Sequence, residues 1–434
     1  MVEIIPEMHT LGSINPHTLF VDLNRASRSE IVAARGGAGA PQGWEIYEHE
    51  ARHWLDLVST VWGRGYLDLD LLFRTYDAIL TTPERQMDRT VQTVLELFDR
   101  DRSILFPSYY KYVLPEARGL KPDDRWSMGF STGITVGTDG QLDDRRPFIF
   151  VRFDAGSTHF ARQPVSDGSL LETRALAAEV AATTEWLRQR PVGEDVVTWQ
   201  LREPEQRAAF YNPELTTYSV AAHVVAYATG VNQIRQNLAL SSKLADIVLN
   251  LTDCCFAGLR PPTGLGNPTQ SRLRGFRKSR SRGFAFCCLA FGLRPVAGFG
   301  DLGRKEIEVA MKMAGLPTLS KVYRDARQAI AREPGRCAVQ PKLAEIRGKL
   351  IDAGRRLHRE PDFDAQVAEL CPSGDLPAPL VGDSACEEFS LGAAPLDMAE
   401  SEFLFDCHER YREVLRSALR AARGFEFVLT DFVY

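Results

Sequence analysis

Residues 44–58 read WEIYEHEARHWLDLV and carry a clear helical pattern near the start of the chain. Apolar and histidine side chains recur there at spacings of three and four, which places them on one face of an α-helix. These positions are Ile46, His49, His53, Leu57 and Val61. A glycine-rich loop at residues 36–41 precedes the pattern, and Gly63 and Gly65 follow it. The sequence therefore predicts a helix from Trp44 to about Val61.

The pentapeptide His-Glu-Ala-Arg-His at residues 49–53 is a candidate metal site. Histidines four residues apart lie one helical turn from each other, so both imidazoles can reach one zinc ion at about 2 Å. Glu50 is offset by about 100° around the helix. There it can take a proton from zinc-bound water, whose pKa the metal lowers. This is the logic of the His-Glu-x-x-His motif. The alternative is a surface or core helix that holds two histidines by chance.

Asp56 follows His53 by three residues on the same predicted face. It either accepts the free ring N–H of a ligand histidine or is a solvated helix charge. A catalytic zinc normally has three protein ligands and one open position. Ser59 stands where the metzincin type of site has its third histidine, so that extension is absent. We therefore expect the third ligand to be a carboxylate on another helix.

Glu172 is the candidate for this third ligand, because it stands near the start of an alanine-rich helix that can pack closely against another helix. With it, the chain resembles the gluzincin type of metallopeptidase, in residues 49–53 and 172–179. The resemblance implies a His/His/Glu zinc site and hydrolysis of protein or peptide bonds, with Glu50 as general base. Two alternatives stay open. Ser169 and Glu172 also fit a capping box, and Glu179 is a second-shell residue or the ligand itself.

Two further histidines are candidate donors to the oxyanion that peptide hydrolysis develops. His159 is placed in a loop before the helix of Glu172. His223 lies in an apolar helix, where the alternative is a hydrogen-bonded core histidine. The basic run at residues 272–282 holds six positive charges in eleven residues. It is expected to be a solvated, mobile loop rather than a contact for phosphates or an acidic partner.

The fold class is expected to be α+β and mainly helical. We predict a zincin-like domain with a small sheet at residues 1–257, a loop or linker rich in Gly, Pro and Arg at 258–283, and a helical C-terminal domain at 284–434. Apolar residues that recur every second position indicate strands, and apolar residues that recur every three to four positions indicate helices. Strands are predicted at 20–23, 134–137, 148–151 and 425–432, and helices at 67–80, 84–97, 170–189 and 217–240.

Composition and charge limit which classes of protein fit this sequence. The 434 residues carry a net charge of −5 and are 44 % hydrophobic and 25 % charged, as in ordinary globular proteins. The segment 1–16 has neither the basic start nor the apolar run of a secretory signal. Eight cysteines without a Cys-x-x-Cys motif favour a reducing cytoplasm over a disulfide framework. Neither membrane nor nucleic acid is an expected partner. The rival to a zinc peptidase is a binding or scaffold protein with a vestigial motif.

Overall fold

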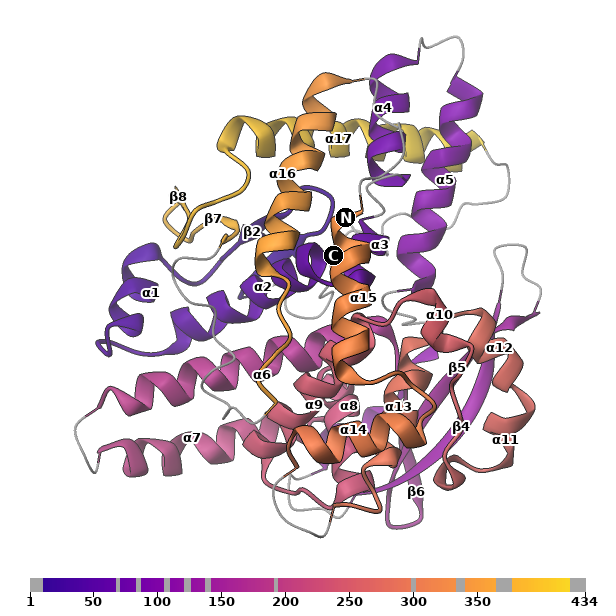
Figure 1. The fold of residues 1–434 in the computed structure, drawn as a ribbon. Helices are drawn as coiled ribbons and strands as arrows, with labels where there is room; N and C mark the ends of the chain where they lie inside the picture. Colours follow the sequence, from indigo (N-terminus) through magenta and orange to yellow (C-terminus); the bar gives the residue numbers. More distant parts are fainter. Residues whose placement is uncertain are drawn as a thin grey trace. The chain divides into compact units, whose positions relative to one another are not determined.

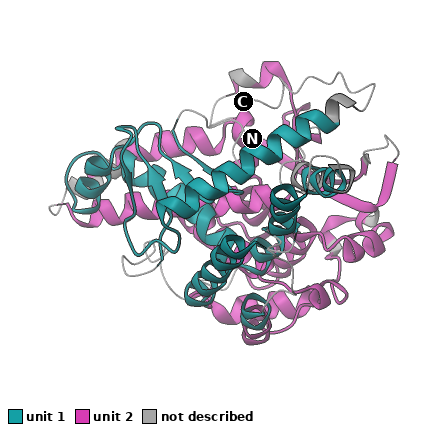
Figure 2. Ribbon diagram, turned by 90° about the horizontal axis from the view of Figure 1, so that it is seen from above, with its two compact units in different colours: residues 1–103, 327–359, 372–434 teal, residues 104–326, 360–371 magenta. Residues whose placement is uncertain are grey.

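In the computed structural model the chain is mixed α/β and mostly helical, with 62 % in helices and 13 % in strands. The structure describes residues 11–67, 71–82, 87–104, 110–120, 126–136, 142–190, 194–297, 302–332, 340–363 and 377–421. Two compact units emerge, each discontinuous in sequence (Figure 2). Unit 1 comprises residues 1–103, 327–359 and 372–434, and unit 2 comprises 104–326 and 360–371. Neither unit follows the sequential boundaries that the sequence predicts at residues 257 and 283.

Unit 1 combines a four-stranded sheet with helices from both ends of the chain (Figure 1). Its elements are β1 (Ser13–Asn15), β2 (Phe20–Asp22), α1 (Arg28–Arg35), α2 (Gln42–Ser59), α3 (Val61–Tyr66), α4 (Phe73–Thr81), α5 (Met87–Ile104), α16 (Pro341–Leu357), β7 (Leu380–Gly382), β8 (Glu388–Phe389) and α17 (Met398–Ala421). The helix α15 (Leu319–Ala331) contributes residues to both units. The strand order is β1-β2-β7-β8, with β2 parallel to β7 and Val21 opposite Val381.

The core of unit 1 is built around α2. This helix packs against α1, α3, α16 and β1, and fifteen of its eighteen residues are buried. Gly354 brings α16 into close contact with it, since a Cβ atom there would lie 2.3 Å from the carbonyl oxygen of Val58. A helix covered on all sides in this way is held by packing rather than by its intrinsic propensity.

Unit 2 has its own four-stranded antiparallel sheet with helices packed against it. Its elements are β3 (Tyr112–Val113), η4 (Pro115–Gly119), β4 (Trp126–Val136), β5 (Leu142–Ala155), β6 (Thr158–Pro164), α6 (Asp167–Arg188), α7 (Glu194–Phe210), η5 (Pro213–Leu215), α8 (Thr216–Thr229), α9 (Ile234–Leu249), α10 (Asp253–Phe256), η6 (Thr263–Leu265), α11 (Asn267–Ser271), α12 (Leu273–Lys278), α13 (Arg282–Gly292) and α14 (Arg304–Met313). The strand order is β3-β6-β5-β4.

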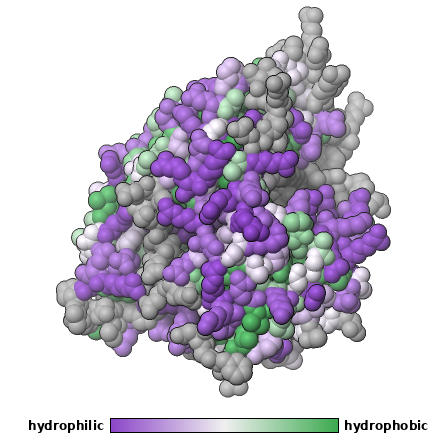
Figure 3. Space-filling view, in the orientation of Figure 1, coloured by the Kyte–Doolittle hydropathy of each residue, from purple (hydrophilic) through white to green (hydrophobic). Residues whose placement is uncertain are grey.

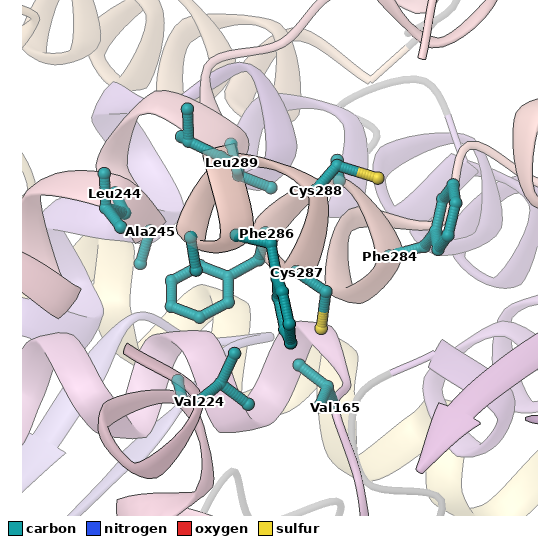
Figure 4. Packing of buried hydrophobic residues seen from close by; sticks show 14 of the residues in the cluster. Val165, Val224, Leu244, Ala245, Phe284, Phe286, Cys287, Cys288 and Leu289 are labelled. Carbon is teal, nitrogen blue, oxygen red and sulfur yellow. The ribbon is translucent and has the colours of Figure 1, made fainter. Parts of the chain in front are cut away.

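The core of unit 2 lies between one face of this sheet and the helices α8, α9 and α13. Alternate residues of β5, Ile149, Val151 and Phe153, are fully buried, as a strand with one face on a core requires. Figure 4 shows how α13 fills this core with aromatic, aliphatic and cysteine side chains. Gly283 lets the start of α13 approach the backbone of Val165, because any side chain there would collide with it.

Several elements differ from the sequence predictions for identifiable reasons. The helix predicted at 217–240 is divided into α8 and α9, because Gly230 adopts a left-handed conformation (φ 77°) that ends α8. The segment 258–283, predicted as a linker or mobile loop, contains α11 and α12 and lies wholly inside unit 2. The C-terminal region is not purely helical, since β7 and β8 join the sheet of β2. The strand predicted at 425–432 lies outside the described residues.

The other predicted elements are found close to their expected places. α2, α4, α5 and α6 correspond to the four helices predicted in the first half of the chain, and β2, β4 and β5 overlap the strands predicted at 20–23, 134–137 and 148–151. No helix in the described part of the chain is long and apolar enough to cross a lipid bilayer. The face in Figure 3 is mostly hydrophilic, with hydrophobic residues scattered among the polar ones.

Candidate metal centre

The helix α2 holds His49 and His53 one turn apart inside unit 1, as their spacing predicts. Their rings lie edge to face with centroids 5.1 Å apart. Both histidines are almost fully buried, at 2 % and 1 % exposure, and Glu50 between them is 1 % exposed. Asp56, which the sequence places on the same face, is also fully buried. It is therefore not the solvated helix charge of the alternative interpretation.

The C-terminal end of α2 is fixed by hydrogen bonds between side chains and the backbone. Thr60 Oγ1 donates a hydrogen bond to the carbonyl of Asp56 (2.6 Å) and accepts one from the N–H of Gly63 (2.9 Å). His358 on the segment after α16 bonds through Nδ1 to the carbonyl of Ser59 (2.9 Å). These bonds satisfy carbonyl groups that a helix C-terminus leaves without partners, and they fix where the helix ends.

Glu50 has a neighbour that sequence reasoning did not single out. A Cβ atom added at Gly12 would lie 3.2 Å from Cγ of Glu50 and 3.0 Å from Ile46. The backbone before β1 therefore lies directly against the Glu50 side chain. On the other side of α2, Glu48 accepts a hydrogen bond from the Trp44 indole (2.9 Å), and burial raises the pKa of the Glu48 carboxyl. The surroundings of α2 are thus poorly solvated.

Glu172 lies on α6 and is fully buried. The capping box predicted for Ser169 and Glu172 does not form, because α6 begins earlier than expected. Ser166 is the N-cap, and its reciprocal partner is Ser169: the Ser166 N–H donates to Ser169 Oγ (2.9 Å) and the Ser169 N–H to Ser166 Oγ (3.3 Å). Glu172 is therefore one turn too far along the helix to cap it. The Glu172 carboxylate therefore does not serve as the capping group of α6.

A buried network holds α6 in place two residues beyond Glu172. Arg174 forms an ion pair with Asp246 on α9, and the same carboxylate accepts the hydroxyl hydrogen of Tyr323 on α15. Burial, followed by the nearby Asp246 charge, raises the pKa of Tyr323, so its hydroxyl remains a donor. Thr173 donates to the carbonyl of Tyr218 on α8 (3.0 Å). An acidic residue inside the otherwise apolar end of α9 was the available sequence signal for this network.

Among the described residues, one group of three metal-ligating side chains comes together. It consists of His49, His53 and Glu172, with one ring nitrogen of each histidine and one carboxylate oxygen all within 4.8 Å of one another. Donors around one tetrahedral ion are roughly 3.4 Å apart, which lies within this limit. Two imidazoles and a carboxylate are ligands that zinc accepts. The residues present therefore fit a metal ion such as Zn²⁺, although ligand chemistry alone does not fix which ion it is.

The other candidate residues lie outside this group. Glu179 is partly buried on α6 and is not among the three donors. His159 lies on β6, where its Nδ1–H donates to the Phe153 carbonyl (3.2 Å) and faces the Asp154 carboxylate (3.3 Å).

His223 has the environment of a core histidine. Its Nε2–H donates to the Phe210 carbonyl (3.2 Å), and its ring packs against Trp126, Phe153 and Tyr211. Burial lowers the pKa of His223 to about 4, so the ring is neutral at physiological pH. An imidazole enclosed by aromatic rings and bonded to a main-chain carbonyl already has a structural role.

The basic run is folded rather than loose. Phe276, in its middle, is fully buried and stacks on Phe284 with ring centroids 4.2 Å apart. Arg277 donates to the Leu259 carbonyl from both Nε (3.0 Å) and Nη2 (2.6 Å). The sequence prediction of a mobile loop did not account for this aromatic anchor, which attaches the short helix α12 to the core.

Comparisons of this chain with known proteins find no match. No protein-family model, no curated protein and no solved structure matches it.

Proposed function

We propose that this protein is a zinc-dependent hydrolase of protein or peptide bonds. The observation that carries the proposal is the group of His49, His53 and Glu172, whose donor atoms lie within 4.8 Å of one another. Glu50 stands between the two histidines on α2, at the place of the general base in the His-Glu-x-x-His motif. The preference for peptide bonds comes from the resemblance of this motif to that of the gluzincins.

In this proposal each residue has a defined task. His49, His53 and Glu172 hold the ion, which when bound supplies a Lewis acid that acidifies water and polarises a carbonyl group. The Glu50 carboxylate accepts the proton of the attacking water and passes it to the leaving amine. Its contact with Gly12 restricts where the side chain can point. The poorly solvated surroundings of α2 strengthen the electrostatic interactions that these steps use.

Paired substitutions on one helix test the proposal. Glu50→Gln should leave zinc bound in a 1:1 ratio and abolish cleavage of fluorescein-labelled casein and of a mixed peptide library. Glu45→Gln is the matched control, because Glu45 is a second buried glutamate of α2, at 8 % exposure, and should retain activity. A Glu50→Gln variant as active as the wild type would rule out this mechanism, and a zinc-free wild type would rule out the centre itself.

One observation favours a second function. A catalytic zinc keeps an open coordination position, whereas a structural zinc is closed, and His49, His53 and Glu172 are each at most 2 % exposed. The second candidate is therefore a non-catalytic binding or scaffold protein with a structural metal. A small hydroxamate, which binds zinc at an open position, distinguishes the two. Binding of acetohydroxamate that requires the metal supports the hydrolase, and its absence in zinc-loaded protein supports the scaffold.

A further inference from the structure

The two pairs of adjacent cysteines have very different surroundings. Cys287 and Cys288 lie in α13, within the hydrophobic core of unit 2, and are fully buried (Figure 4). Burial raises the pKa of both thiols, so they behave as small apolar side chains. In the second pair, Cys254 is exposed and Cys255 is 4 % exposed. Only this pair offers a sulfur atom to solvent.

Cys254 and Cys255 lie in the single turn of the short helix α10, whose N-cap is Thr252. The Thr252 hydroxyl lies 3.2 Å from Sγ of Cys254 and 3.5 Å from Sγ of Cys255. Both sulfurs therefore face the same hydroxyl group instead of pointing in opposite directions. The Cys255 N–H donates to the Thr252 carbonyl (2.9 Å), which fixes the backbone of the turn. The structure thus presents two thiols on one side of a defined turn.

Both acidic and basic side chains lie around the pair. Asp253 could repel a thiolate, but its carboxylate is paired with Arg280 at 2.9 Å. Lys321 interacts electrostatically with Cys254; the pKa of Lys321 is raised first by its bond to Asp325 and also by this thiol. Burial raises the pKa of the Cys255 thiol.

We propose that Cys254 and Cys255 form a two-thiol site for trivalent arsenic. A disulfide fits less well, because consecutive Cα atoms are about 3.8 Å apart and disulfides usually span roughly 4.4–6.8 Å between Cα atoms. An arsenic atom inserted between the two sulfurs removes that constraint. With an organic arsenoxide, two S–H bonds and the As–O double bond are replaced by two As–S bonds. The two thiol protons and the oxygen leave as water, and no electrons are transferred.

Phenylarsine oxide and intact-mass spectrometry under native conditions test this site. We expect one phenylarsenic group per chain, retained in excess 2-mercaptoethanol and released by 2,3-dimercaptopropanol, because a chelate resists single thiols. Cys254→Ser and Cys255→Ser should each abolish the adduct. Cys386→Ser, which removes a different exposed cysteine, should keep it.

Three outcomes would overturn the proposal: no adduct on the folded wild type, an adduct that survives Cys254→Ser, or an adduct that 2-mercaptoethanol releases. Cys254 is exposed, so its serine variant should fold normally, which circular dichroism checks. The test therefore stands even if Cys255→Ser perturbs α10. Neither cysteine is among the three proposed zinc ligands, His49, His53 and Glu172, so the result does not depend on the proposed zinc centre.

Discussion

Removing the charge of Asp246 should destabilise α6 strongly. The Asp246 carboxylate pairs with Arg174 and accepts the Tyr323 hydroxyl, and the side chains of Arg174 and Asp246 are only 6 % and 13 % exposed. Asp246→Leu removes the carboxylate that pairs with the buried Arg174 guanidinium. Removing one partner of a buried ion pair typically costs about 3–5 kcal/mol. Loss of the hydrogen bond from the Tyr323 hydroxyl to this carboxylate adds about 1–3 kcal/mol.

A triple variant shows whether the destabilisation comes from breaking the ion pair or from losing its members altogether. Arg174→Met/Asp246→Leu/Tyr323→Phe removes both charges of the ion pair and the Tyr323 hydroxyl together. Such replacements are often neutral or stabilising relative to the ion pair. We therefore expect the triple variant to be several kcal/mol more stable than Asp246→Leu alone (on the order of 3 kcal/mol or more).

Amide hydrogen exchange measures this effect locally. Peptides from α6 and α9 in Asp246→Leu should lose protection by at least a hundredfold, since every 1.4 kcal/mol corresponds to about a factor of ten, and the triple variant should regain most of it. Zinc binding supplies a second readout: the affinity should fall in the single variant, because α6 carries Glu172. A triple variant that is no more protected than the single one would refute the reasoning.

Three further predictions follow from buried groups. The folded pKa of His223 (about 4) lies below its unfolded value of about 6.5, so the unfolded chain binds the extra proton and stability falls as pH decreases through this window. Between pH 7 and 5, His223 should contribute a loss of about 2 kcal/mol in the free energy of unfolding. Urea titrations of His223→Phe should no longer show this loss. Gly354→Ala places a Cβ atom 2.3 Å from a carbonyl oxygen of α2 and should cost about 1–3 kcal/mol of stability. Gly348→Ala on the same helix meets nothing within 4 Å and should stabilise the protein by up to about 1 kcal/mol. Equal shifts of the two melting temperatures would contradict this packing. Glu172→Gln should lower zinc content at least tenfold and Glu179→Gln should not, as measured by plasma mass spectrometry; the reverse order would make Glu179 the ligand.

The parts of the fold that the sequence predicts well are those with a strong local period. α2 is the clearest example, because its apolar and histidine positions repeat every three to four residues. The long strands β4 and β5 were also indicated, although only in part. Residues 134–137 and 148–151 show the β pattern, while Gly129, Gly133 and the charged start of β5 weaken it elsewhere.

The features that local pattern misses depend on distant residues. β2 and β7 pair in parallel although about 360 residues separate Val21 from Val381, and a three-residue strand carries no periodic signal of its own. The basic run is helical because one aromatic residue, Phe276, is buried against Phe284. At the candidate site, the two histidines and Glu50 follow from spacing, whereas the cap of α6 was misplaced by one turn. Ser166 and Ser169 form a capping box without the usual glutamate, which made Glu172 look like the capping residue.

X-ray absorption at the zinc edge tests the central claim most directly. On protein purified without added metal, we predict one zinc per chain with two imidazole nitrogens at about 2.0–2.1 Å and oxygen ligands at about 2.0–2.2 Å. One oxygen should come from Glu172, so the spectrum should change in Glu172→Gln. A protein without zinc, or a first shell with sulfur at about 2.3 Å, would contradict a centre built from His49, His53 and Glu172.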